Sequence, residues 1–206
     1  MATELNASAI ILAGGRSSRM GTPKAALDFG GRSILERIVE ELALQFDDLI
    51  IVAAPADTEN FRIEIPGVRI IRDEIAFGGA LDALRRGLLA ARSEIAFACS
   101  CDLPLLKSAI AAKLFATIGA HAAAVPIVDG RAQPLCAVYR KTAAETIAAL
   151  LARGEQRLLA LVAALEARRV SEDELRGADP ALASFINVNT PDDYARALKL
   201  ARGESS

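Results

Sequence analysis

Residues 7–24 read ASAIILAGGRSSRMGTPK: an apolar run, then two glycines, then small hydroxyl residues and cations. The apolar part predicts a buried strand ending at about Ile11. Glycine leaves backbone N–H groups accessible to an anion, because it has no side chain and tolerates unusual backbone angles. Arg16, Arg19 and Lys24 would add positive charge beside phosphate oxygens. We therefore expect a phosphate-binding loop; the alternative is an ordinary strand-to-helix turn with surface cations.

This loop matches neither of the two common phosphate motifs. A Walker loop has four residues between its glycines and Lys-Ser or Lys-Thr after the second, whereas five residues separate Gly15 from Gly21, and Thr22 follows. The dinucleotide fingerprint G-x-G-x-x-G cannot begin at Gly14, because position 16 is an arginine. The loop therefore predicts phosphate chemistry that is neither that of a standard NTPase nor that of a dehydrogenase.

The composition is that of an ordinary globular chain. Of its 206 residues, 52% are hydrophobic and 24% are charged, and the formal net charge is −2. Such a balance argues against a nucleic-acid partner bound through bulk electrostatics. Three cysteines and one histidine do not provide the spaced pairs of a zinc site. The sequence shows no signal-peptide pattern and no stretch of transmembrane length, so we expect a cytoplasmic protein with no membrane partner.

Short apolar runs alternate with helical patterns along the chain. Strands are predicted at residues 49–53, 68–71, 95–99, 122–126, 135–139 and 185–187. Helices are predicted at residues 34–44, 79–91, 107–118, 142–151 and 158–167, and from residue 191 onward. Ser33 and Glu36 have the spacing of a capping box, and Thr190 has the position of an N-cap before proline and two acids.

Strands that are apolar throughout and separated by helices are typical of a parallel sheet covered on both faces. The expected fold class is therefore α/β, with three layers and a mainly parallel sheet. We expect one domain over residues 1–206, with its core at about residues 7–202 and a frayed tail at residues 203–206.

An aspartate follows the apolar strand at residues 95–99. In open α/β sheets ligands bind outside the carboxyl ends of the strands, so Asp102 should lie near the glycine loop. A carboxylate there can hold Mg²⁺, which takes few protein ligands and bridges substrate phosphates. The alternative is that Asp102 only caps the following turn. Cys99 and Cys101 are interpreted as packing residues rather than nucleophiles.

Two further segments are candidates for ligand contacts. Asp73 follows the strand predicted at residues 68–71, and Gly78-Gly79 begins a helix whose N-terminus favours an anion; a plain turn is the alternative. Asn187 and Asn189 alternate, so both amides would point to one face of an extended segment and could bind a polar heterocycle or a phosphate. Asparagine near a helix cap is also commonplace, and these residues alone favour that reading.

Taken together, three motifs resemble those of the molybdenum cofactor guanylyltransferases, MobA-like members of a nucleotidyltransferase group with a Rossmann-like sheet. The motifs are L-A-G-G-x-S-x-R-M-G-x-x-K at residues 12–24, C-D-x-P at residues 101–104 and N-V-N-T-P-x-D at residues 187–193. The resemblance covers about residues 9–198. The first motif marks only the broad group, whereas its pairing with N-V-N-T-P is much more specific.

The resemblance implies a nucleotide site in which GTP is the substrate. The backbone of Leu12, Ala13 and Gly14 would contact the base and sugar, and Gly15 would lie at the phosphates. Asp73 would also contact the nucleotide.

The resemblance also implies the catalytic and acceptor residues. Arg19 and Lys24 would face the triphosphate, and Asp102 would hold Mg²⁺. Asn187 and Asn189 would face the pterin acceptor. The expected reaction transfers GMP from GTP to the terminal phosphate of Mo-molybdopterin and releases pyrophosphate, with transient contacts to proteins that deliver the cofactor or to molybdoenzyme chaperones.

Two departures from the family pattern lie beside the expected nucleotide. Ala53 stands where the family often has asparagine, and residues 78–82 read GGALD where the family often has G-P-L-A-G. Asp82 would add negative charge near the site if it pointed inward. These departures leave three alternatives open: a CTP-dependent cytidylyltransferase acting on the same cofactor, a sugar-phosphate nucleotidyltransferase, and a nucleotide-binding protein without catalytic activity.

Overall fold

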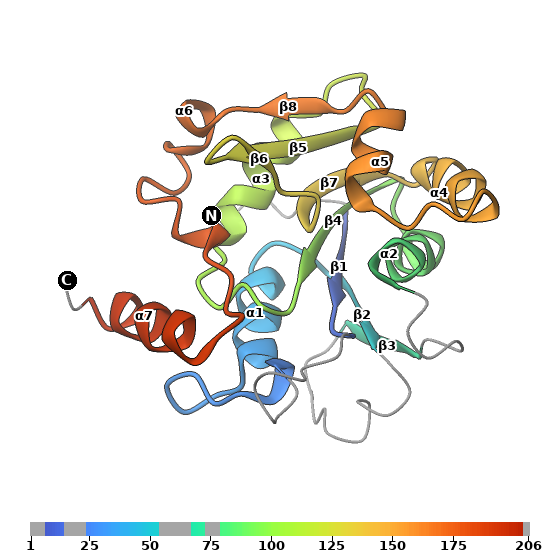
Figure 1. Ribbon diagram of the computed structural model, residues 1–206. Helices are drawn as coiled ribbons and strands as arrows, with labels where there is room; N and C mark the ends of the chain where they lie inside the picture. Colours follow the sequence, from blue (N-terminus) through green and yellow to red (C-terminus); the bar gives the residue numbers. More distant parts are fainter. Residues whose placement is uncertain (1–6, 15–23, 54–66, 73–78, 204–206) are drawn as a thin grey trace.

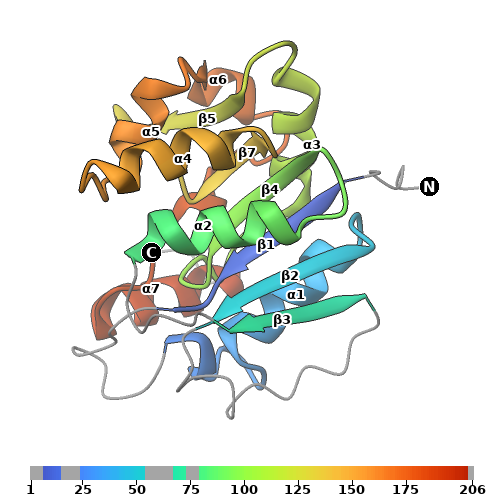
Figure 2. The same ribbon diagram turned by 90° about the vertical axis from the view of Figure 1, so that its right-hand side faces the viewer.

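The computed structural model describes residues 7–14, 24–53, 67–72 and 79–203 of the chain (Figure 1). These residues form an eight-stranded sheet with helices against both of its faces. In Figure 2, α2, α4 and α5 lie in front of the sheet, and α1 and α3 lie behind it.

The elements follow one another in an α/β rhythm. The strands are β1 (Ser8–Leu12), β2 (Asp48–Ala53), β3 (Val68–Arg72), β4 (Ile95–Ser100), β5 (Ala123–Val128), β6 (Arg131–Ala132), β7 (Cys136–Arg140) and β8 (Arg168–Val170). The α-helices are α1 (Ile34–Ala43), α2 (Gly79–Ala90), α3 (Ser108–Thr117), α4 (Ala143–Ala152), α5 (Leu158–Ala164), α6 (Glu172–Leu175) and α7 (Pro191–Ala201). Two 3₁₀-helices, η1 (Lys24–Ala26) and η3 (Ala183–Phe185), complete the described elements.

The sheet order is β3-β2-β1-β4-β7-β5-β6, with β8 paired to β5. Strands β3, β2, β1 and β4 run parallel to one another, whereas β7 runs antiparallel to both β4 and β5. The α/β prediction is confirmed, with a sheet that is mixed and mostly parallel. Because β1 lies between β2 and β4, the chain reverses its direction of winding there, and such a switch point is where open α/β sheets bind ligands.

Strand side chains alternate between two apolar layers. Ala9 and Ile11 of β1 pack with α1 and α3, whereas Ile10 and Leu12 pack with α2 and α4. Gly87 permits the close approach of α2, since a Cβ atom there would lie 2.4 Å from the side chain of Ile10. All five β1 residues are buried, which explains why the strand is apolar after Ser8.

Two helix starts that local sequence predicts are confirmed. The Ser33 hydroxyl accepts a hydrogen bond from the amide of Glu36, whose carboxylate accepts one from the Ser33 amide. Thr190 and Asp193 form the same reciprocal pair at the start of α7. Each pair satisfies backbone donors that the helix itself cannot satisfy.

Other predictions from the sequence are wrong in detail. No strand forms at residues 185–187; the chain makes η3 and then runs beside the connection between β4 and α3, where its partners are loop groups rather than a sheet edge. The helix predicted to reach residue 167 ends at Ala164, because Glu166 takes a left-handed conformation with φ of 45°. The chain then forms β8, which the sequence analysis missed together with β6 and α6.

Among the described residues, no helix is both long enough and apolar enough to cross a bilayer.

A buried carboxylate joins the amino ends of three parallel strands. Asp48 of β2 accepts hydrogen bonds from the Ser8 hydroxyl at 2.6 Å, from the Arg92 amide at 3.0 Å, and from Nη2 and Nε of Arg69 at 2.6 and 3.1 Å. Burial alone would raise the pKa of Asp48, but these bonds outweigh it and hold the pKa below its ordinary value of 3.8. Asp48 therefore ties β1, β3 and the end of α2 together as an ionised group.

Replacing Asp48 by Asn should lower the free energy of unfolding by about 2 kcal/mol at pH 7, because charge-assisted bonds are lost. A depressed pKa means that this stability is present above pH 3.8 and is lost as the pH falls through the folded-state pKa. Urea unfolding at pH 7 and near pH 3 measures it, with exposed Asp47→Asn as control. The wild type and Asp48→Asn should converge in acid; an equal difference at both pH values would contradict the account.

Candidate functional site

The carboxyl ends of β1 and β4 meet at the switch point of the sheet. Leu12 lies opposite Ser100 in the parallel register, and the Leu12 carbonyl accepts a hydrogen bond from the Cys101 amide at 3.1 Å. The Ala13 amide donates to the Val52 carbonyl at 2.8 Å. Both segments that the sequence singled out, the first loop and the C-D-x-P turn, therefore leave the sheet side by side.

These bonds affect the predicted nucleotide contacts. The Ala13 amide is already donated to β2, and the Leu12 carbonyl already accepts one bond, while both side chains are buried. Gly14 is the first exposed residue after β1. Any backbone recognition of a base in this conformation must therefore rest on Gly14, the Ala13 carbonyl or residues that follow.

Several predicted residues lie outside the described part of the chain. These are Gly15, Arg19 and Asp73, together with the side chain of Lys24, whose backbone begins η1. They flank described segments at the same edge of the sheet, since Gly15 follows β1 and Asp73 follows β3, which runs parallel to it through β2. Their predicted roles stay predictions.

Asp102 lies two residues beyond the end of β4 and is half-buried. Its Oδ1 accepts a hydrogen bond from the Ser100 hydroxyl, which orients the carboxylate. Within the described residues there is no cluster of three or more His, Cys, Asp or Glu side chains that could hold a metal. A single oriented carboxylate suits Mg²⁺, which keeps several waters and uses substrate phosphates as further ligands. Such a donor set does not suit Zn²⁺.

The C-terminal asparagines come to the same place from a distant part of the sequence. The Val188 amide donates to the Asp102 carbonyl at 2.9 Å. Val188 is fully buried, whereas Asn187 and Asn189 on either side of it are exposed. The predicted alternation is therefore confirmed, although the segment is not a strand. The structure thus brings together the end of β1, the turn at Asp102 and the segment that carries these two asparagines.

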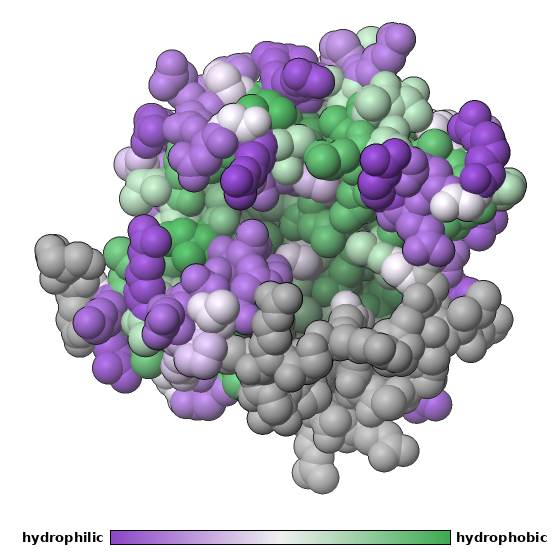
Figure 3. All heavy atoms as spheres, in the orientation of Figure 1, coloured by the Kyte–Doolittle hydropathy of each residue, from purple (hydrophilic) through white to green (hydrophobic). Residues whose placement is uncertain are grey.

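The sequence analysis did not predict the role of Ser100 or the bond between Val188 and Asp102, which joins the C-D-x-P turn to the N-V-N-T-P segment. Ser100 precedes Asp102 by two residues, so the period of a strand places both on one face, and that spacing was an available signal. No sequence signal pairs residue 188 with residue 102, because they come together only in the folded chain. Figure 3 shows a hollow with an apolar floor over the part of the sheet where β1, β4 and β7 lie in Figure 1.

The structure shows what surrounds Ala53 and Asp82, the residues at the two departures from the family pattern. The Ala53 side chain is 1% exposed and packs in the layer with α1, so it does not face solvent at the edge of the sheet. Asp82 in the first turn of α2 is neutralised by Arg86, with 3.0 Å between Oδ2 and Nε. The charge of Asp82 is therefore compensated within its own helix.

The cysteines are packing residues, as predicted. Cys99, Cys101 and Cys136 are free and buried, and burial is the main cause that raises the pKa of Cys99 well above its ordinary value. A thiol held protonated is a poor nucleophile. Chemistry at this edge of the sheet therefore falls to charged and amide groups.

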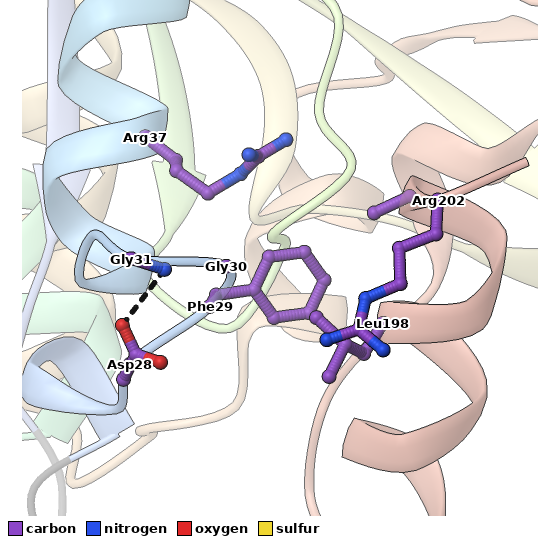
Figure 4. Close-up of a pocket in the computed structure, with 8 residues that line it drawn as sticks. Asp28, Phe29, Gly30, Gly31, Arg37, Leu198 and Arg202 are labelled. Carbon is purple, nitrogen blue, oxygen red and sulfur yellow. Dashed lines mark hydrogen bonds between the residues drawn. The ribbon is translucent and has the colours of Figure 1, made fainter.

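A separate cleft of about 570 Å³ lies between the turn at residues 28–31, α1 and α7 (Figure 4). Phe29 forms its inner wall, in edge-to-face contact with Tyr194 and with the Arg37 guanidinium 5.2 Å from the ring centre. Among the described residues, none of those predicted for the site lines this cleft. It supports the packing of α7 rather than the chemistry at the strand ends.

Comparison with known proteins shows which family this chain belongs to. The sequence profile of the MobA-like NTP transferase domain matches residues 9–170. The probable molybdenum cofactor guanylyltransferase of Methanosarcina mazei is 35% identical over 204 residues, covering 95% of this chain and 91% of that protein. The molybdenum cofactor guanylyltransferase of Desulfosudis oleivorans is 35% identical over 191 residues, covering 91% and 92%.

A solved structure shares the fold. The molybdopterin-guanine dinucleotide biosynthesis protein A of Archaeoglobus fulgidus superposes with a TM-score of 0.82 and 23% identity, covering 95% of this chain and 99% of that one. The fold of this chain is therefore one that a solved structure shares.

Proposed function

Because this chain belongs to the MobA-like NTP transferase domain family, we propose that it is a molybdenum cofactor guanylyltransferase. It would transfer GMP from GTP to the terminal phosphate of Mo-molybdopterin and release pyrophosphate. The observation that carries this proposal is the meeting of three motifs at one edge of the sheet. The Cys101–Leu12 and Val188–Asp102 backbone bonds join the loop after β1, the turn after β4 and the paired asparagines.

The reaction needs positioning and charge neutralisation more than acid–base catalysis. An oxygen of the acceptor phosphate forms a bond to the α-phosphorus of GTP, and the bond to the bridging oxygen of pyrophosphate breaks, so the leaving group departs with the electron pair. A phosphate monoester is already anionic, so no strong base is required. Lys24 and Arg19, in the loop after β1, are proposed to neutralise the triphosphate.

Asp102 is the proposed ligand for Mg²⁺. Its carboxylate is oriented by Ser100 and lies beside the strand end from which the phosphate loop departs. A bound Mg²⁺ would neutralise charge on the phosphates and hold them in place. The role of the protein is then to keep one carboxylate oxygen at the junction between the nucleotide and the acceptor.

The exposed amides of Asn187 and Asn189 are proposed to bind the pterin. Each amide offers both donors and an acceptor, which suits a heterocycle with ring nitrogens and a carbonyl. Val188 anchors the segment from its buried side, so both amides are presented away from the core. The bond between residue 188 and Asp102 supports an acceptor side next to the proposed metal.

The preference for GTP over CTP depends on the loop after β1 and on Ala53. The two glycines at 14 and 15 leave room for a purine. Ala53 provides no polar side-chain contact to a base, because it is buried. Selection would then rest on backbone groups from Gly14 onward. A cytidylyltransferase acting on the same cofactor is the second candidate, and Ala53 is the observation that favours it.

A product assay tests the proposal. Purified protein, Mo-molybdopterin, Mg²⁺ and equal concentrations of GTP and CTP should give the guanine dinucleotide as the main product, since each well-made polar contact contributes about 1 kcal/mol to discrimination. Chromatography of the dinucleotide products measures the ratio of guanine to cytosine product. If the main product is the cytosine dinucleotide, the protein is a cytidylyltransferase rather than a guanylyltransferase. If neither nucleotide gives a product, the proposal that the protein is a transferase is contradicted.

Replacing Asp102 by Asn should lower kcat by about 10²-fold, because a metal contact is worth several kcal/mol to the transition state. The variant should also lose the tightening of GTP binding by Mg²⁺ in calorimetric titration. Asp173→Asn, in an exposed first turn of α6, is the matched control and should behave as wild type. If Asp102→Asn keeps its metal dependence, the ligand lies elsewhere and Asp102 is a turn cap.

A further inference from the structure

A second carboxylate is buried at the other end of the segment that carries the two asparagines. Asp179 is 0% exposed. Its Oδ1 accepts a hydrogen bond from Nζ of Lys107 at 2.8 Å, and its Oδ2 accepts from the amide and the hydroxyl of Ser184, both at 2.8 Å. The Ser184 hydroxyl in turn accepts from the Lys107 amide at 3.1 Å. These three residues form a closed ring of charged and polar contacts.

The ring lies on the same two segments as the Val188–Asp102 bond. Residues 101–107 connect β4 to α3, and residues 176–190, which include Asp179 and η3, connect α6 to α7. The first connection is held to the second at its start by the Asp102 carbonyl and at its end by Lys107. With both ends fixed, residues 186–189 have one position relative to Asp102.

Simple burial would stabilise these segments without fixing their register. Leu103, Leu106 and Phe185 are buried in the same apolar cluster, and such packing is not directional. An ion pair that is hydrogen-bonded at every oxygen is directional, and fixing a register is the best-attested role of buried charge. Burial would raise the pKa of Asp179, but the bonds from Lys107 and Ser184 outweigh it, so the carboxylate stays ionised.

We propose that Asp179 and Lys107 are positioning residues that hold the asparagine segment against the Asp102 turn, and so present the acceptor phosphate to the α-phosphorus of GTP. This proposal rests on the proposed function for its chemistry. Neither residue touches substrate; they act through Asn187 and Asn189. Loss of the ring should therefore impair use of the acceptor while leaving the nucleotide side intact.

The test compares three variants. Lys107→Met keeps the length of a side chain that is half exposed but removes its charge, and Lys107→Arg restores the charge. Asp48→Asn is the matched control, because it also breaks a buried ion pair, at the amino ends of the parallel strands. Each is assayed for the KM of Mo-molybdopterin and the KM of GTP, after thermal unfolding has shown that it is folded at the assay temperature.

Lys107→Met should raise the KM of the acceptor by about tenfold or more, since small misplacements of a reacting group are costly, and change the KM of GTP by less than about twofold. Lys107→Arg should return the acceptor KM most of the way to wild type. Asp48→Asn should change neither KM, although it lowers stability. An unchanged acceptor KM in Lys107→Met, parallel rises in both KM values, or the same split in Asp48→Asn would overturn the proposal.

Hydrogen exchange separates this proposal from the proposed function. In the protein without substrates, the amides of Ser184 and Val188 should exchange faster by about tenfold in Lys107→Met, and at the wild-type rate in Asp48→Asn. Unchanged exchange would overturn the positioning role even if the product assay succeeds. If exchange is faster but the protein makes no guanine dinucleotide, the result supports the positioning of this segment. It then refutes only the proposed acceptor substrate.

Discussion

Two backbone hydrogen bonds hold the candidate site together. One runs from the Cys101 amide to the Leu12 carbonyl and the other from the Val188 amide to the Asp102 carbonyl. The first bond is possible because β1 and β4 run parallel and end in register. The second brings a segment from near the C-terminus to the turn after β4. Together they place groups that are 86 residues apart in the chain, at positions 102 and 188, within hydrogen-bond distance.

Two buried carboxylates hold the segments around this arrangement in place. Asp48 joins the amino ends of the parallel strands, and Asp179 joins the C-terminal segment to α3. Both are ionised and hydrogen-bonded on both oxygens, which offsets much of the cost of burying a charge. The core between them is aliphatic and supplies most of the stabilisation, whereas the two charged groups fix how the segments are aligned.

The sequence predicted those features whose causes are local. β1 follows from an unbroken apolar run, and the starts of α1 and α7 follow from capping residues at fixed spacing. The first two motifs also predicted one shared edge, because parallel strands with helical connections bring their carboxyl ends together. The fold class and the neighbourhood of Asp102 could therefore be predicted before any coordinates.

Features that depend on distant pairing could not be predicted in this way. The direction of β7 and the presence of β8 depend on which neighbour each strand finds, and a short apolar run carries no such information. The strand expected at residues 185–187 did not form, since the amides of Phe185 and Ile186 donate to the carbonyls of Leu182 and Ala183 rather than to a neighbouring strand. The hydrogen bond from the Ala13 amide to the Val52 carbonyl of β2 could not be predicted from the sequence either.

The proposed metal on Asp102 would lie between the nucleotide loop and the asparagine segment. Mn²⁺ binds the same carboxylate and phosphate oxygens as Mg²⁺ and broadens the NMR signals of nearby amides. With GTP and Mn²⁺ bound, the amides of Gly14, Val188 and Asn189 should be broadened most. Those of Ser8 and Asp48 should be broadened least, because each strand rises by about 3.3 Å per residue and they lie at its far end. Unaffected signals at residues 188 and 189, or strongest broadening at Ser8 and Asp48, would contradict the account.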